Sequence, residues 1–142
     1  MKALFASLAL VLGAVTISAA DEKDLTAGKW VVESVTRDGK AVEALKGAIR
    51  ENGDGKYTLT PAKDSKAPAA SGTYKIDATK TPATMDTVAK GGTYDGKTLL
   101  GIVKADGDTL TLAFAEPGKD RPTKFESAEG SGIVLVVHKK AK

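Results

Sequence analysis

The sequence contains no cysteine and only one histidine, His138. The lack of cysteine excludes disulfides, thiolate metal ligands and cysteine nucleophiles, and a lone histidine cannot build a zinc site, which needs several ligands. Aromatic residues make up 5% of the chain, which is too few to favour a large stacked cofactor. No pair of acidic residues and no serine stands in a recognisable catalytic pattern. The sequence therefore predicts no catalytic residues, no metal site and no cofactor.

Long apolar runs are also absent, except for residues 3–17, which follow the positively charged Lys2. This run ends in Ser18-Ala19-Ala20 and is followed at once by the charged residues DEKD. The layout is that of a secretory signal peptide cleaved after Ala20. A membrane anchor, the alternative, needs about 20 predominantly apolar residues. We expect residues 1–20 to be a signal peptide and residues 21–142 to be one exported domain, periplasmic or extracellular, without a stable membrane anchor after cleavage.

Neither sign of charge dominates, because the net charge is only +3 and acidic and basic residues are interspersed. No basic stripe is interleaved with aromatic residues, as a protein that binds single-stranded nucleic acid would need. The composition favours a mixed, soluble surface. We expect a monomer that does not bind nucleic acid.

What the chain does have is a series of short apolar or alternating segments separated by turns rich in glycine and aspartate. The clearest is TLTLAF at 109–114, which follows Asp106-Gly107, a strong hairpin signal. Similar segments lie at 30–35, 48–51, 57–60, 72–76, 85–89, 99–104 and 133–137. About eight strands without a long helix predict an all-β fold, an antiparallel up-and-down barrel, because closure removes the sheet edges. A two-sheet sandwich is the structural alternative.

Three blocks of sequence carry a family resemblance: LTAGKWVVESVTRDGKAV, GKTLLGIVKADGDTLTLAFAEPGKDRPTKF and GSGIVLVV, in that order. Gly28-Lys29-Trp30 within the first block resembles the Gly-x-Trp motif at the start of the first lipocalin strand. From about Leu25 to Lys139 the chain resembles a family of exported lipocalin-like domains that is abundant in planctomycetes. The resemblance implies a lipocalin-like β-barrel whose closed end is plugged by Trp30, and it implies no activity or ligand.

Residues 91–98, GGTYDGKT, match the phosphate-binding pattern G-x-x-x-x-G-K-[ST]. That pattern requires a helix that begins at the Lys-Ser/Thr and adds its N-terminal dipole to the phosphate site. Here LLGIVKADGD follows, which reads as a strand and a hairpin turn. We interpret the motif as a loop between two antiparallel strands.

The remaining candidate site is the interior or mouth of the barrel, because an eight-stranded barrel is either filled by side chains or holds one small ligand. The candidate ligand-binding residues are Trp30, Tyr57, Tyr74, Ile102, Leu112, Phe114 and Arg121. Arg121 lies in a long polar loop, where it could hold an anionic group. Alternatively it braces the loop through a carboxylate or stacks on an aromatic ring, as an arginine near the closed end does in many lipocalins. We favour the structural role. We interpret His138 as a polar residue at the exit of the last strand.

The sequence thus favours a non-enzymatic domain that binds a small, partly apolar molecule inside the barrel. The alternative is a structural or protein-interaction module of the cell envelope, with a packed barrel and no ligand. A cavity of at least ~300 Å³ that opens to solvent would favour the ligand, and a barrel packed to its axis would favour the alternative.

Overall fold

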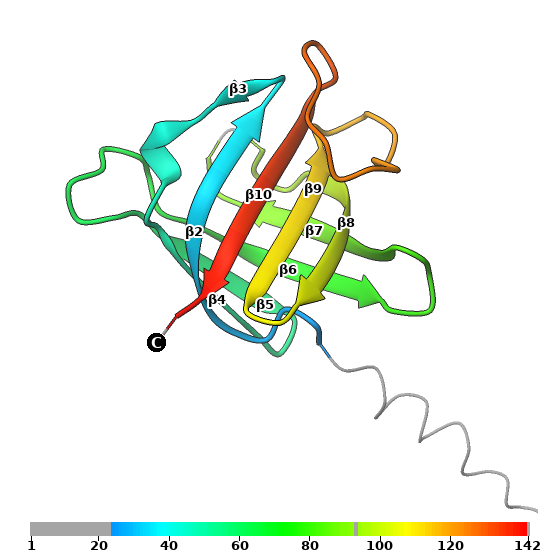
Figure 1. The fold of residues 1–142 in the computed structure, drawn as a ribbon, viewed down its shortest axis with the longest axis horizontal. Coiled ribbons are helices and arrows are strands. Elements are labelled where there is room, and N and C mark those ends of the chain that lie inside the picture. The colour runs from blue at the N-terminus through cyan, green and yellow to red at the C-terminus, as the bar shows by residue number, and fades with distance from the viewer. Residues whose placement is uncertain (1–23, 93, 142) are drawn as a thin grey trace, which may run out of the picture.

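The computed structural model describes residues 24–92 and 94–141, so the predicted signal peptide lies outside the described residues. One antiparallel sheet contains all the strands of the described residues, in the order β10-β9-β8-β7-β6-β5-β4-β2-β3. The last strand, β10, also pairs with β2 and closes the sheet into a barrel of eight strands (Figure 1). This confirms the predicted antiparallel barrel and removes the two-sheet sandwich.

Each strand follows its predecessor around the barrel, as the spacing of the segments predicts. The strands are β2 (Gly28–Arg37), β3 (Lys40–Ala41), β4 (Ile49–Gly53), β5 (Lys56–Thr60), β6 (Ala70–Asp77), β7 (Ala83–Lys90), β8 (Thr98–Asp106), β9 (Thr109–Ala115) and β10 (Ile133–Lys140). The two-residue strand β3 only extends the edge beside β2 and is not part of the closed barrel. A single turn of 3-10 helix, η1 (Glu43–Leu45), follows it.

Tight hairpins explain why so short a chain closes a barrel. Asp54-Gly55 joins the paired residues Gly53 and Lys56, and φ is +52° and +74° at the two loop residues. Positive φ at both positions defines a type I′ turn, whose twist matches that of the flanking strands. At the β8–β9 hairpin the loop residues are Gly107-Asp108, one position later than the Asp-Gly pair suggests, because Asp106 still pairs with Thr109.

The GGTYDGKT segment is the loop between β7 and β8, as interpreted from the sequence. Its backbone folds back on itself: the amide of Gly96 donates to the carbonyl of Ala89 at 2.8 Å, and the Asp95 carboxylate accepts from the amide of Gly91 at 2.6 Å. Strand β8 begins directly at Thr98 and is antiparallel to β7. The motif therefore lacks the helix that a phosphate-binding loop uses.

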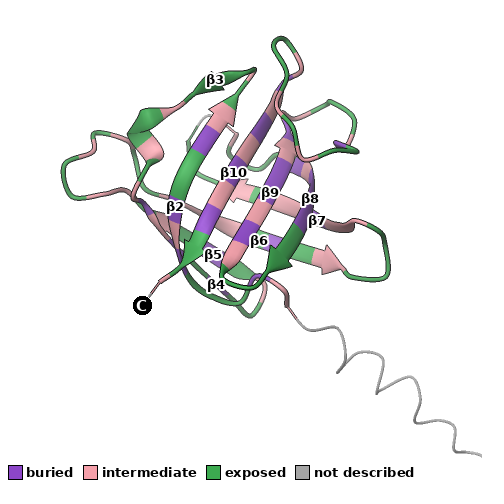
Figure 2. Cartoon of the chain, viewed as in Figure 1, coloured by how far each residue is buried: buried purple, intermediate pink, exposed green. Residues whose placement is uncertain are grey.

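Alternation along the strands separates an inner from an outer face, and buried residues recur at every second position of β10 (Figure 2). In β2 the alternation is interrupted by a register shift between Val32 and Ser34, so the next buried residue after Val32 is Val35. At one end of the barrel lie the N-terminal segment 24–27, the hairpin tips at 54–55 and 107–108, and the end of β10. The loops 61–69, 91–97 and 116–132 lie at the opposite end, which we call the loop end.

Candidate functional site

The N-terminal segment is bonded to the inner residues at its end of the barrel. The carbonyl of Thr26 accepts hydrogen bonds from Trp30 Nε1 at 2.9 Å and from Asn52 Nδ2 at 3.0 Å. The Asp24 carboxylate accepts from the hydroxyls of Thr26 and Tyr74. Thr26 and Trp30 are buried, so this end of the barrel is closed by chain and side chains together.

A buried cation lies deeper inside the barrel. Arg50 points inward from β4 and is 8% exposed. Its Nε donates to Asn52 Oδ1 at 2.9 Å, and its guanidinium carbon lies 4.4 Å from the centre of the Tyr57 ring, a cation–π distance. Among the residues that the structure describes, no carboxylate forms an ion pair with Arg50, and its two terminal nitrogens have no hydrogen-bond partner. The site therefore holds a buried cation without a direct ion pair, although the Asp24 carboxylate acts on it at longer range.

Burial sets the electrostatics of this region. It lowers the pKa of Arg50 to about 10, an effect that Tyr57, Tyr74 and Asp24 partly offset. Burial also raises the pKa of Tyr57, against the effect of Arg50, and together with the bond to Asp24 raises that of Tyr74 to about 12. Near neutral pH the guanidinium is therefore charged and both phenols are neutral.

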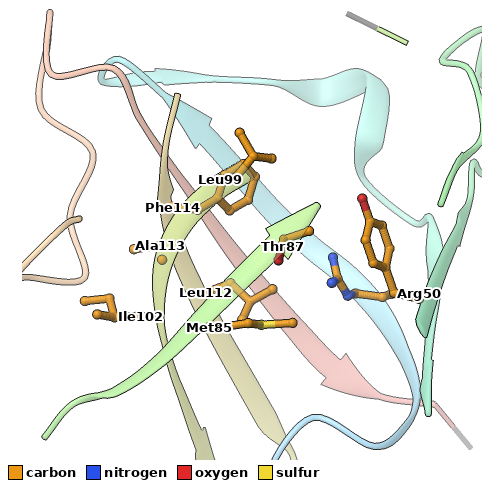
Figure 3. Close-up of a pocket in the computed structure, with 10 residues that line it drawn as sticks. Arg50, Met85, Thr87, Leu99, Ile102, Leu112, Ala113 and Phe114 are labelled. Atoms are coloured by element: carbon orange, nitrogen blue, oxygen red, sulfur yellow. The ribbon is translucent and has the colours of Figure 1, made fainter. Parts of the chain in front are cut away.

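The terminal nitrogens of Arg50 border a cavity of about 50 Å³. Figure 3 shows the guanidinium directed across the barrel toward Thr87 and Met85. Other side chains of the inner face complete the wall: Tyr57, Leu99, Leu112 and Phe114. Leu99 and Phe114 stand near the loop end of their strands, so the cavity extends from Arg50 toward that end. The arrangement is one cation at the base of a small, mostly apolar chamber.

His138 also faces the interior, from strand β10, which lies between β2 and β9. It pairs with Val32 and Leu110, is 1% exposed, and its Nδ1 lies 3.0 Å from the carbonyl of Leu110. Since a carbonyl only accepts, Nδ1 carries the proton in this bond. Burial and the nearby Arg50 lower the pKa of His138 to about 4, against the opposing effect of the Leu110 bond. The exit of the last strand lies two residues further on, so His138 belongs to the core.

Five of the residues predicted for the site do face the interior: Trp30, Tyr57, Tyr74, Leu112 and Phe114. They are not gathered in one place. Tyr57, Leu112 and Phe114 line the cavity, whereas Trp30 and Tyr74 are bonded to the N-terminal segment at the closed end.

The side chains of Ile102 and Arg121 do not lie inside the barrel, where the candidate site is predicted from the sequence. Gly101 pairs with Phe114 on the inner face, so the next residue, Ile102, directs its side chain outward, although Ile102 itself is among the residues that border the cavity (Figure 3). Arg121 Nη1 donates to the carbonyl of Gly101 at 2.8 Å and lies 2.7 Å from Asp86 Oδ1. Arg121 thus braces its loop against the outer wall through a carboxylate, the structural role favoured above. Lys140, not Arg121, lies over the Trp30 ring, at 5.7 Å.

Sequence reasoning missed the residue that defines the cavity, Arg50. Its segment, AIRENG, shows a polar and an apolar residue on each face, so alternation alone does not say which face is buried. Only the pairing of Arg50 with Trp30 on one side and Leu59 on the other fixes it inside. Thr87 and Met85 were missed for the same reason, because their strand is weakly patterned.

No protein-family model, curated protein or solved structure matches this chain. Within residues 24–92 and 94–141 no three His, Asp or Glu side chains are grouped as metal ligands. The same residues include no helix that is long and apolar enough to cross a membrane. The barrel interior combines a cavity with a buried cation that forms no ion pair with the described residues.

Proposed function

We propose that this chain is an exported, non-enzymatic, lipocalin-like module that binds a small molecule inside its barrel. One observation carries the proposal: the inner face borders a cavity, and the terminal nitrogens of a buried arginine face it without a hydrogen-bond partner among the described residues. A buried charge without a direct ion pair is costly, whereas a ligand that supplies one offsets that cost.

The size of the cavity limits what it holds. Its volume of about 50 Å³ is well below the ~300 Å³ expected for a drug-sized ligand. It exceeds the ~10–15 Å³ that one water molecule needs. The ligand is therefore a small molecule or one end of a larger one, rather than a bulky apolar molecule enclosed whole.

The alternative, a structural or protein-interaction module with a packed barrel and no ligand, is favoured by how much of the interior the side chains fill. Twelve buried residues form one continuous core cluster through the barrel. Native mass spectrometry of the protein, purified from its own host under mild conditions, distinguishes the two functions directly.

The expected result is a fraction of the protein that carries one small bound mass, which is lost when the protein is unfolded and refolded. The refolded protein serves as the matched control, because it differs only in the ligand. If every preparation has the mass of the polypeptide alone, and no compound in a panel of small metabolites raises Tm, the packed-barrel alternative holds.

A further inference from the structure

We propose that the ligand is a short aliphatic monocarboxylate, whose carboxylate binds the terminal nitrogens of Arg50 while its chain lies between Met85, Leu99, Leu112 and Phe114. This inference rests on the proposed function and adds the chemical class of the ligand. The donor geometry of Arg50, the buried charges and the apolar walls of the same cavity favour this class of ligand.

The donors fit a planar anion. Arg50 is held from behind by Asn52 on Nε and from one face by the Tyr57 ring, so its terminal edge points toward Thr87 (Figure 3). That edge presents parallel N–H groups, which match the two oxygens of a carboxylate. Because the guanidinium is fixed before binding, little conformational freedom remains to be lost.

The charge balance favours a monoanion. Arg50 is the only arginine or lysine that is buried among the described residues. His138, the nearest other basic group in the core, is neutral at pH 7 because burial lowers its pKa to about 4. Asp24 already acts on Arg50 without forming an ion pair, so one further carboxylate is enough to neutralise the cation, whereas a phosphate monoester would bring excess negative charge into a mostly apolar chamber.

The walls favour an aliphatic chain over a second polar group. Apart from Arg50, Tyr57 and Thr87, the side chains that face the cavity are apolar. A second hydroxyl or amide on the ligand would be desolvated there without a partner, which is costly. The volume of about 50 Å³ fits a carboxylate with a chain of only a few carbon atoms, directed to the loop end.

The test compares sodium butyrate with butyramide and 1-butanol, its neutral analogues of equal chain length, and with sodium chloride at the same ionic strength. The readouts are Tm and the fluorescence of Trp30, the only tryptophan, which pairs with Arg50 across β2 and β4. We expect butyrate at about twenty times its Kd to raise Tm by about 5 °C. The neutral analogues and chloride are expected to change Tm by less than ~1 °C at equal concentration.

Two variants and a matched control locate the binding. Arg50→Met removes the cation, and Leu99→Phe fills the cavity while leaving Arg50 in place; each is expected to lower butyrate affinity at least tenfold. Arg37→Met removes an exposed arginine at the end of β2 and is expected to bind butyrate like the wild type. In the absence of butyrate, Arg50→Met is expected to melt at or above the wild-type Tm, because an unpaired buried charge has been removed.

The outcomes separate the two proposals. If butyrate and its neutral analogues bind equally well, and Leu99→Phe abolishes both, the barrel binds small molecules but the inference about the carboxylate is overturned. If butyrate binds the Leu99→Phe variant as it binds the wild type, the site is not this cavity and the inference fails. If none of the compounds binds and native mass spectrometry finds no ligand, the proposed function fails with it.

Discussion

The buried His138 predicts a specific loss of stability in mild acid. The imidazole is 1% exposed and donates from Nδ1 to the Leu110 carbonyl. Burial, and then the charge of Arg50, hold its pKa at about 4 in the folded chain, below the ordinary value of 6.5. The perturbation that tests this is a change of pH from 7 to 5, because most carboxylates protonate only below that range.

The sign follows from which state binds the proton. Between pH 6.5 and 4 the imidazole is protonated in the unfolded chain but not in the folded one, so lowering the pH favours unfolding. Stability is lost as the pH falls through 6.5, and the loss is complete near pH 4. A difference of about 2.5 pKa units corresponds to about 3 kcal/mol in all, of which about 2 kcal/mol falls between pH 7 and pH 5.

The assay is urea unfolding at pH 7 and pH 5, followed by the fluorescence of the single tryptophan. The control is His138→Asn, whose side-chain amide can donate to Leu110 from the position of Nδ1 but does not titrate. The variant's stability at pH 7 need not equal that of the wild type, since only the change between the two pH values is compared. We expect the wild type to lose about 2 kcal/mol between them, and the variant less than ~0.5 kcal/mol.

Because the chain has one histidine, NMR of its imidazole measures the same quantity independently. A titration midpoint below pH 5 in the folded protein agrees with the structure. A midpoint above pH 6, or an equal loss of stability in His138→Asn, would refute the reasoning, because the imidazole would then be hydrated and not part of the core.

Three further predictions concern packing, the closed end and the outer loop. Gly72→Ala is expected to lower the free energy of unfolding in urea by about 2–3 kcal/mol, because the new Cβ would clash with the backbone carbonyl oxygen of Val88. Gly53→Ala is the control: no atom lies within 4 Å of its new Cβ, so we expect it to be neutral or slightly stabilising. Tyr74→Phe loses the hydrogen bond to Asp24 and is expected to lower the free energy of unfolding by about 1–2 kcal/mol. Tyr94→Phe loses only a 3.4 Å hydrogen bond to Glu116 and is expected to lower it by less than ~0.5 kcal/mol. Equal losses in the two variants would contradict the role of the closed end. Arg121→Met is expected to cost at most ~1 kcal/mol, since its ion pair is 30% and 42% exposed, yet to speed proteolytic cleavage of loop 116–132 without changing butyrate affinity.

The fold was predictable because local signals and global closure agree. Asp-Gly pairs stand where hairpins form, and the clean alternation of TLTLAF placed Leu110, Leu112 and Phe114 on the inner face. Eight such segments in succession have few arrangements other than a meander that closes on itself. The GGTYDGKT loop was interpreted correctly by the same reasoning, since its neighbours were strands.

The cavity was not predictable in this way, because its residues meet only through long-range pairing. Arg50 and Leu99 are on opposite sides of the barrel, and nothing local to either segment indicates the other. Arg121 could be described in the sequence only by its loop, and its partner Asp86 lies in another strand, so its role stayed open until the register was known. The alternation of apolar residues predicts which face of a strand is buried, but only the pairing of the strands determines which buried residues line the cavity together.

Arg50 and His138, which interrupt the apolar pattern of the interior, do not stabilise the fold. A core filled by aliphatic residues would be more stable than one that buries Arg50 without an ion pair and keeps His138 neutral at a pH where a hydrated imidazole is protonated. Asn52 and Tyr57 offset part of this cost, but they leave the terminal nitrogens of Arg50 facing the cavity. A monocarboxylate would neutralise the charge and, by the same attraction, ease protonation of His138. Binding is therefore expected to raise the pKa of His138 and to weaken the acid sensitivity. At equal concentrations of the ionised carboxylate, butyrate is expected to protect the wild type more at pH 5 than at pH 7, and equal protection at both would show that the two groups are not coupled.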